Sequence, residues 1–179
     1  MKKENQRIML TKRLLKESFV ELLLQKDIHK ISIRELCDNA GINHCTFYKY
    51  FGSQYDLLQE MENDMLYTLG KTLSELTENA PLKIMLSYLQ DNVKIARLLI
   101  NNNVDPLFPR KLFSLPVVQE FFLKRLSDNY SKNNFDYMCS FIFYGAFRVA
   151  QKWLNKDERE SPEEIEKLLI SLLNKFLDI

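Results

Sequence analysis

Glycine, proline, cysteine and histidine are all scarce in this chain. Four glycines and five prolines among 179 residues leave little material for the turns of a β-rich fold. The three cysteines, Cys37, Cys45 and Cys139, are odd in number and form no CxxC pair. The sequence therefore indicates neither a disulfide framework nor a zinc site, and it fits a reducing cytosol.

Segments that cross membranes and motifs of common enzymes are also missing. No stretch reaches about 18 uncharged apolar residues, and the N-terminus lacks the apolar run of a signal peptide. There is no Gly-rich phosphate loop, HExxH or GxSxG motif. His29 and Cys37 form an enzyme-like pair on paper, but Cys37 falls on a helix face expected to pack in the core. We therefore expect a cytoplasmic, non-enzymatic protein with no metal, cofactor or membrane partner.

The charges are unevenly distributed along the chain. Residues 1–53 hold ten Lys/Arg and six Asp/Glu, a net charge of +4, whereas residues 54–179 hold 15 and 18, a net charge of −3. A basic N-terminal part on a mildly acidic body suits a head that binds nucleic acid and a body that does not. Chance asymmetry is the alternative that charge alone leaves open.

Apolar residues recur at helical spacing through most of the chain, which predicts an all-α fold of about nine helices. Breaks are expected at residues 26–30, at the prolines and asparagines of 101–109, and at 132–134. Pro116 is expected to kink a helix, and Ser161 with Pro162 and Glu164 to begin one. The expected helices cover about 6–25, 32–40, 43–50, 54–76, 81–90, 92–102, 110–131, 135–154 and 162–177.

Residues 31–58 have the spacing of a helix-turn-helix. Ser32 and Glu35 form a capping box that begins a short helix, and Gly41 can take the left-handed backbone that ends it. Asn43 is a good N-cap for the next helix. The residues expected to face inward as scaffold are Leu36, Cys37, Ala40, Phe47 and Phe51.

The outward face of the second helix carries side chains that can contact DNA. His44 and Thr46 can hydrogen-bond to base edges or phosphates, and Lys49 can pair with phosphate or guanine. The alternative is a solvated surface helix of a structural bundle, but such a face is normally richer in Glu and Lys than in tyrosine. The candidate DNA contacts are His44, Cys45, Thr46, Tyr48, Lys49 and Tyr50.

Residues 7–58 resemble the DNA-binding domain of the TetR/AcrR family of bacterial regulators. The resemblance rests on the runs SIRELCDNAGI, from Ser32 to Ile42, and TFYKYF, from Thr46 to Phe51. It implies DNA contact by the six outward residues, with flanking phosphate contacts from Thr11, Ser32 and Arg34.

One departure from the family pattern is Gln54, where many members have a lysine that opens the fourth helix near the DNA backbone. Gln54, or the helix N-terminal amides alone, would then hold the phosphate, and affinity would depend less on salt. Lys2, Lys3 and Arg7 form either a basic arm that reaches DNA or a disordered, solvated terminus.

Cys45 has two interpretations. An exposed thiol on the recognition helix is a candidate redox switch, because a helix N-terminus lowers the pKa of a thiol. The simpler alternative, which we favour, is a small side chain that fits the groove and touches a thymine methyl.

The resemblance implies a division into a DNA-binding domain, residues 1–53, and a helical regulatory and dimerisation domain, residues 54–179. In such bodies the last two helices of each protomer form a four-helix bundle across a two-fold dimer. The wide apolar faces of both helices fit this expectation, although a monomer core is the alternative. The expected interface residues are Phe141, Tyr144, Gly145, Arg148, Trp153, Leu168, Leu169, Leu172, Leu173 and Phe176.

The body of such a regulator also holds a ligand cavity. Most aromatic residues at helical spacing are core, so the assignment of each residue to this cavity is a hypothesis. Arg97 and Arg148 lie within apolar stretches and either bind an anionic group or form salt bridges to neighbouring helices. The candidate pocket residues are Met65, Met85, Tyr88, Leu89, Leu99, Phe108, Phe113, Phe121, Phe122, Tyr144 and Arg148.

Together these features predict a homodimeric, TetR-like transcription regulator, in the first instance a repressor. Two recognition helices about 34–36 Å apart would bind a palindromic double-stranded operator, and a small-molecule effector would release them. One rival is an activating co-regulator with a protein partner. The other is a helical interaction module whose head no longer binds DNA.

Overall fold

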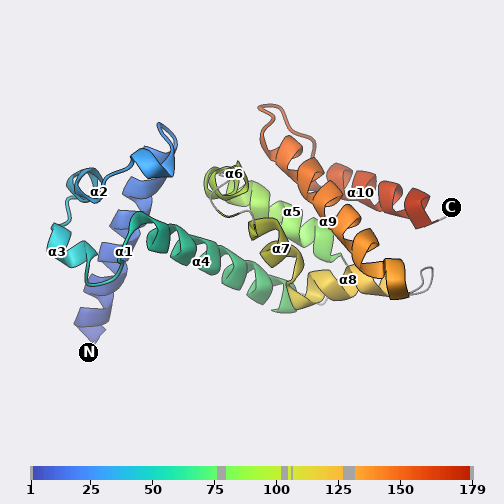
Figure 1. Cartoon of the computed structure of the whole chain (residues 1–179), viewed down its shortest axis with the longest axis horizontal. Helices are drawn as coiled ribbons and strands as arrows, with labels where there is room; N and C mark the ends of the chain where they lie inside the picture. The colour runs from blue at the N-terminus through green and yellow to red at the C-terminus, as the bar shows by residue number, and fades with distance from the viewer. Residues whose placement is uncertain (1, 76–79, 102–104, 106, 127–131, 178–179) are drawn as a thin grey trace. The chain divides into compact units, whose positions relative to one another are not determined.

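The chain is all-α in a computed structural model that describes residues 2–75, 80–101, 105, 107–126 and 132–177 (Figure 1). This confirms the predicted fold class, and no strand occurs in these ranges. The elements are α1 (Lys2–Leu23), the 3₁₀ turn η1 (Ile28–Lys30), α2 (Ile33–Ala40), α3 (His44–Phe47), α4 (Gln54–Glu75), α5 (Pro81–Asp91), α6 (Val93–Asn101), α7 (Phe108–Phe113), α8 (Pro116–Leu126), α9 (Lys132–Leu154) and α10 (Pro162–Leu177).

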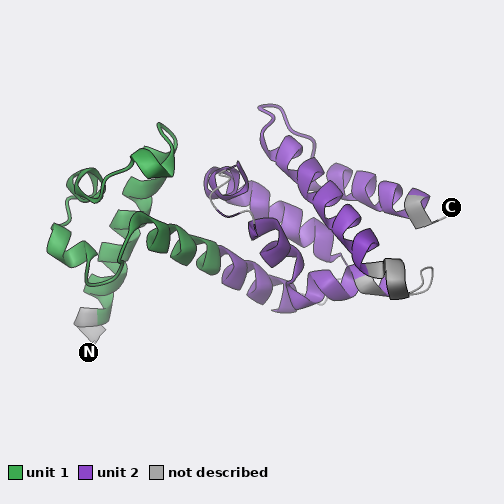
Figure 2. Ribbon diagram, viewed as in Figure 1, with its two compact units in different colours: residues 1–64 green, residues 65–179 purple. Residues whose placement is uncertain are grey.

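The chain forms two compact units, Met1–Asp64 and Met65–Ile179, coloured separately in Figure 2. Helix α4 begins at the boundary expected from the sequence, and its first half belongs to unit 1. None of the described helices is long and apolar enough to cross a membrane.

Two expectations about the N-terminal helices are corrected. Helix α1 begins at Lys2 instead of near Gln6, so the backbone of Lys2 and Lys3 is helical and not disordered. Helix α3 ends at Phe47, and the residues after it form a turn. The N–H of Tyr50 donates to the Phe47 carbonyl three residues back, which is the hydrogen bond of a 3₁₀ turn and not of an α-helix.

The helix expected over 110–131 is two helices among the described residues. Helix α7 begins at Phe108, inside the expected loop, and α8 begins at Pro116, so the proline starts a helix instead of kinking one. The break expected at 132–134 is instead the first turn of α9. Asparagine favours helix starts as well as breaks, so its presence alone does not distinguish them. Residues 102–104, 106 and 127–131 of these segments lie outside the described residues.

Unit 1 is built around a small apolar core beneath α1 and α2, which pack against each other. The repeat of apolar residues along α1 places Leu15 and Phe19 inward, where both are fully buried. Leu36 from α2, Phe47 from α3 and Leu57 from α4 are also fully buried. The recognition segment, residues 32–51, is therefore attached to α1 and α4 by the same core.

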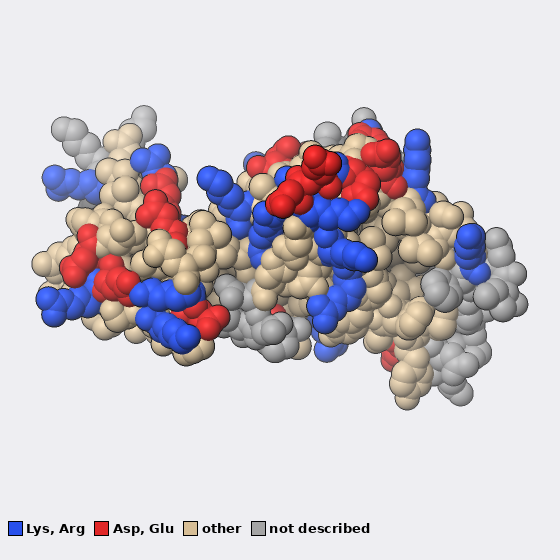
Figure 3. Space-filling model, turned by 90° about the horizontal axis from the view of Figure 1, so that it is seen from above, with Lys and Arg blue, Asp and Glu red and all other residues tan. Residues whose placement is uncertain are grey.

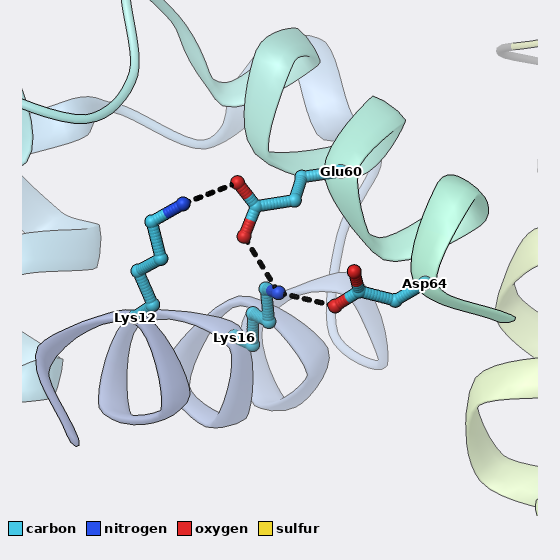
Figure 4. Close-up of polar contacts among 4 residues, drawn as sticks. All are labelled: Lys12, Lys16, Glu60 and Asp64. Carbon is cyan, nitrogen blue, oxygen red and sulfur yellow. Dashed lines mark hydrogen bonds and ion pairs between the residues drawn. The ribbon is translucent and has the colours of Figure 1, made fainter. Parts of the chain in front are cut away.

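An ion-pair cluster joins α1 to α4 within unit 1 (Figure 4). The Nζ atoms of Lys12 and Lys16 each lie 2.7 Å from a carboxylate oxygen of Glu60, and Lys16 Nζ lies 2.6 Å from Asp64 Oδ2. Partial burial alone would raise the pKa of Glu60, but the hydrogen bonds from the two lysines outweigh it and lower that pKa. Burial likewise opposes the charge of Lys16, but its hydrogen bonds to Asp64 and Glu60 raise the Lys16 pKa.

In unit 2, α5 packs against α10, and α9 packs against α6, α7 and α10. An aromatic cluster fills part of its interior: the rings of Phe113 and Phe143 stack with centroids 5.1 Å apart, and Phe122 meets Phe143 edge-on at 5.2 Å. The indole of Trp153 is buried, and its N–H donates to the Glu160 carbonyl at 2.8 Å. The side chain of Trp153 therefore fixes the turn that leads from α9 into α10.

Helices α6 and α9 cap each other at their C-terminal ends. Arg97 from α6 donates from Nε to the Leu154 carbonyl at 2.6 Å and from Nη2 to the Lys156 carbonyl at 2.9 Å. In return, Gln151 from α9 donates to the Ile100 carbonyl at 3.0 Å. Arg97 thus satisfies carbonyls that a helix end leaves unpaired, in place of the anion or the salt bridge expected from the sequence.

We expect Glu60→Gln to lower the free energy of unfolding at neutral pH by about 1 kcal/mol, because half-buried Lys12 loses its carboxylate partner and Lys16 keeps only Asp64. The folded pKa of Glu60 lies below its ordinary value of 4.5, so the wild type keeps this contribution above that pH. It loses the contribution as the pH falls through the folded pKa. The measurement is thermal unfolding by circular dichroism across this pH range.

Glu17→Gln is the matched control, since the ion pair of Glu17 with Arg13, at 3.6 Å, is exposed to solvent. It is expected to leave both the stability and its acid dependence unchanged. Equal acid dependence in wild type and Glu60→Gln would contradict the lowered pKa.

Candidate nucleic-acid interface

The segment from Ser32 to Phe47 forms a helix-turn-helix whose ends are set by local hydrogen bonds. Ser32 Oγ accepts from the N–H of Glu35 at 3.2 Å and begins α2. Gly41 ends it with φ of 65°, and the N–H of Ile42 donates to the Cys37 carbonyl at 2.9 Å. Asn43 Oδ1 accepts from the N–H of Cys45 at 2.8 Å and begins α3. The caps predicted at Ser32, Gly41 and Asn43 are all confirmed.

The capping box at Ser32 is completed differently from the expectation. The carboxylate of Glu35 pairs with Lys26 Nζ at 2.5 Å. Lys26 lies in the segment between α1 and η1, so Glu35 ties α2 to the end of α1. At Ser161 the full box does form, because Glu164 Oε2 accepts from the Ser161 N–H at 2.8 Å and Ser161 Oγ accepts from the Glu164 N–H at 3.3 Å.

A polar clamp that the sequence analysis missed holds α2 against α1. Ser18 is 4% exposed, and its hydroxyl donates to the Leu36 carbonyl at 3.0 Å. The amide of Asn39 donates to Ser18 Oγ and to Glu21 Oε2, both at 3.0 Å. The available signal was a serine on the apolar face of α1, beside Leu15, Phe19 and Leu22. A buried hydroxyl needs a partner, which here fixes how α2 sits on α1.

Two buried phenylalanines orient the residues after the turn. Phe47 and Phe51 are 0% and 4% exposed, and their ring centroids lie 5.5 Å apart. Tyr48 meets Phe47 edge-on and is 60% exposed, so it projects into solvent. The predicted scaffold residues Leu36, Cys37, Phe47 and Phe51 are confirmed as buried, and Ala40 is half-buried. Burial raises the pKa of the Cys37 thiol, which makes it unsuited to nucleophilic chemistry.

The predicted DNA contacts lie on one continuous segment but differ in exposure. Cys45, Tyr48 and Lys49 are exposed. His44 is half-buried, and its Nε2 lies 3.4 Å from the Arg34 carbonyl. Ser32 and Arg34 on α2 are also exposed, while Thr46, Tyr50, Thr11 and Gln54 are half-buried. The side chain of Lys3 lies outside the described residues.

Many basic side chains of unit 1 are already paired with carboxylates. Arg34 Nε lies 3.7 Å from Asp38 Oδ2, and Lys12, Lys16 and Lys26 have the partners given above. Figure 3 shows basic and acidic side chains interspersed on one face of the molecule. Lys49 is exposed and has no ion pair within the described part of the chain. Its charge is therefore available to a phosphate or a guanine.

The structure places most predicted pocket residues in the interior of unit 2. Met65, Met85, Leu89, Leu99, Phe108, Phe113, Phe121 and Phe122 are buried. Tyr88 is half-buried, whereas Tyr144 and Arg148 are exposed. Arg148 Nη1 donates to Gln151 Oε1 at 2.5 Å, so it joins the polar network between α6 and α9. Phe143, at the centre of the aromatic cluster, was not among the residues expected from the sequence.

The predicted interface residues divide into two groups. Trp153, Leu169 and Leu173 are buried within the single chain. Phe141, Tyr144, Leu168 and Leu172 are 59%, 50%, 47% and 38% exposed, and Gly145 and Arg148 are exposed beside them on α9. The side chain of Phe176 lies outside the described residues.

A helix-turn-helix with capped helices, a buried aromatic scaffold and exposed tyrosine and lysine side chains defines a DNA-binding regulator. Residues 19–61 match the profile described as "Bacterial regulatory proteins, tetR family". Residues 79–175, more than half of the chain, match the profile described as "Transcriptional regulator C-terminal region". The chain belongs to the TetR family of transcriptional regulators, which are not enzymes.

Individual relatives are distant. An uncharacterized HTH-type transcriptional regulator of Bacillus subtilis, YxbF, is 20% identical over 90% of this chain and 44% of its own length. The HTH-type dhaKLM operon transcriptional activator DhaS of Lactococcus lactis is 29% identical over 46% of this chain and 45% of its own length. The match thus spans less than half the length of each of these curated relatives.

Two solved structures share the fold. A TetR transcriptional regulator from Streptococcus agalactiae superposes with a TM-score of 0.73 at 22% identity, over 95% of this chain and 97% of that one. The dihydroxyacetone kinase operon activator DhaS superposes with a TM-score of 0.60 at 16% identity, over the same shares. At these identities the likeness concerns the fold alone.

Gly41→Ala is expected to destabilise the chain by about 1–2 kcal/mol, because an L-residue is strained at positive φ. No atom lies within 4 Å of an added Cβ there, so the penalty arises from the backbone and not from crowding. Gly41→Asn, although larger, is expected to cost less, since asparagine tolerates this conformation. Urea unfolding of the three proteins checks this order. An alanine variant as stable as wild type would contradict a left-handed residue at Gly41.

Proposed function

We propose that the chain is a homodimeric repressor that binds a palindromic operator and is released by a small-molecule effector. In this proposal residues 1–53 form the DNA-binding part and residues 54–179 the regulatory and dimerisation part. The observation that carries the DNA-binding role is the exposed surface of Tyr48 and Lys49, held in place by the buried pair Phe47 and Phe51.

The recognition surface comprises His44, Cys45, Thr46, Tyr48, Lys49 and Tyr50. Cys45 and Thr46 belong to the first turn of α3, the part that enters the major groove in helix-turn-helix proteins. Lys49 neutralises a phosphate or binds guanine, and Tyr48 donates its hydroxyl to a phosphate. Ser32, Arg34, Thr11 and Gln54 flank this surface and contact the DNA backbone, with Lys3 in the first turn of α1. Cys45 contributes a small side chain that fits the groove.

Lys49→Met is expected to reduce the slope of log affinity against log salt concentration by about 1.8, because each of the two protomers releases one counterion fewer. Tyr48→Ala is expected to weaken binding by about three- to tenfold with an unchanged slope, because the lost hydroxyl is uncharged. The measurement is fluorescence anisotropy with duplexes that the wild type selects from a random pool and with the DNA upstream of its gene.

Arg13→Met is the matched control, since Arg13 lies on α1 and is paired with Glu17. It is expected to leave the slope nearly unchanged. If the wild type selects no duplex at low salt, the DNA-binding proposal fails and an interaction module becomes the better account.

The dimer proposal rests on the exposed apolar side chains of α9 and α10, two helices that pack against each other within unit 2. Leu168 and Leu172 are one helical turn apart and share a face of α10. Tyr144, Gly145 and Arg148 lie along α9. Apolar patches of this kind mark interfaces, and a palindromic operator requires a two-fold partner.

Leu172→Lys is expected to convert the dimer to a monomer at micromolar concentration, because an ammonium would be buried without a partner. Light scattering after size exclusion measures the mass. Tyr67→Lys is the control, because Tyr67 is 74% exposed on α4, outside the proposed interface. A Leu172→Lys variant that remains dimeric would exclude this face as the interface.

The effector site belongs to the interior of unit 2, among the buried residues around Phe113 and Phe122. A ligand changes DNA affinity only by the difference in its affinities for the two arrangements of the body. A titration in which candidate effectors leave DNA affinity unchanged would argue against this part of the proposal.

A second candidate is an activator that works with a protein partner. It is favoured by the relative DhaS, which is described as a transcriptional activator. Transcription from the promoter upstream of this protein's gene is measured with and without the gene. A repressor lowers this transcription, whereas an activator raises it.

A further inference from the structure

Lys12 occupies the junction of three elements of unit 1. Its Nζ lies 2.7 Å from Glu60 Oε2 on α4, 5.9 Å from the ring centroid of Tyr50 and 5.4 Å from that of Phe51. A single ammonium group on α1 therefore contacts α4 and the two aromatic residues that close the recognition segment. Ammonium groups within about 6 Å of an aromatic centroid are attracted by the negative face of the ring.

The position of this ammonium is itself fixed. The second carboxylate oxygen of Glu60 is held by Lys16, one turn further along α1, and Lys16 is also anchored to Asp64 (Figure 4). Glu60 thus has both oxygens engaged and cannot rotate freely. The Lys12 side chain is 31% exposed, and its range of motion is limited by Glu60 on one side and by the two rings on the other.

The rings of Phe51 and Tyr50 differ in burial and in their proposed role. Phe51 is buried and part of the scaffold, whereas Tyr50 is half-buried and belongs to the proposed DNA-contacting surface. Tyr50 lies in the turn after α3, and a tyrosine side chain has several staggered rotamers. A cation over its ring selects among these orientations and thereby directs the hydroxyl.

We infer that Lys12 is a positioning residue for DNA recognition, which holds the ring of Tyr50 in the orientation that contacts DNA while contributing no phosphate contact of its own. The inference rests on the proposed role of Tyr50 in DNA binding. The charge of Lys12 is balanced by Glu60 at 2.7 Å, so removing Lys12 does not change the number of counterions released from DNA.

The first test compares Lys12→Met with Lys12→Arg in anisotropy titrations over a range of salt concentrations, with duplexes selected by the wild type. Methionine keeps the apolar stem but removes the cation, and we expect affinity to fall by about three- to tenfold with an unchanged salt slope. Arginine keeps a cation over the rings and is expected to restore most of the affinity. Arg13→Met controls for the loss of one positive charge from the same helix.

The second test is a double-mutant cycle with Tyr50→Ala. If Lys12 acts through Tyr50, adding Lys12→Met to Tyr50→Ala produces no further loss of affinity. Circular dichroism melts confirm that each variant is folded at the assay temperature. If the Lys12→Met variant is unfolded at that temperature, Lys12→Gln replaces it. The amide of the introduced glutamine can still donate to Glu60, but it places no charge over the rings.

Three outcomes overturn the inference while leaving DNA binding intact. A salt slope lower by about 1.8 in Lys12→Met would mean that Lys12 of each protomer contacts a phosphate directly. If Lys12→Met lowers DNA affinity equally in the presence and absence of Tyr50, the role of Lys12 is only structural. Wild-type affinity in Lys12→Met would mean that the cation is dispensable. Failure of the wild type to bind any duplex would instead remove the proposed function, and this inference with it.

Discussion

Burial of Phe47 and Phe51 is the constraint on which the recognition segment depends. The two rings are four residues apart and enter the core formed by Leu15, Phe19 and Leu36. Once they are buried, Tyr48 and Lys49 between them project outward, and Tyr48 is 60% exposed. Burial of Phe47 and Phe51 is thus enough to expose Tyr48 and Lys49, and no further contact is needed to hold these two side chains at the surface.

Hydrogen bonds at the ends of the short helices supply what the core does not. Helices as short as α2 and α3 are unstable alone, so their caps and their packing decide whether they form. Ser32, Gly41 and Asn43 set the ends, and the hydroxyl of Ser18 joins α2 to α1. The ion pair of Lys26 with Glu35 adds a connection between α2 and the segment that follows α1.

The elements with strong local signals were predictable from the sequence. The caps of α2 and α3, the buried faces and the all-α class follow from residue types whose effects are local. The clamp at Ser18 and the ion pairs of Glu60 were not predictable, because their partners are 18 to 48 residues away along the chain. The break within residues 110–131 was misassigned since a proline can begin a helix as readily as kink it.

The reciprocal caps of α6 and α9 have a consequence for cooperativity. Arg97 satisfies carbonyls at the end of α9, and Gln151 satisfies one at the end of α6. If either end frays, it withdraws the side chain that caps the other, so the two ends open as one unit. The C-terminal end of α6 therefore cannot loosen without α9.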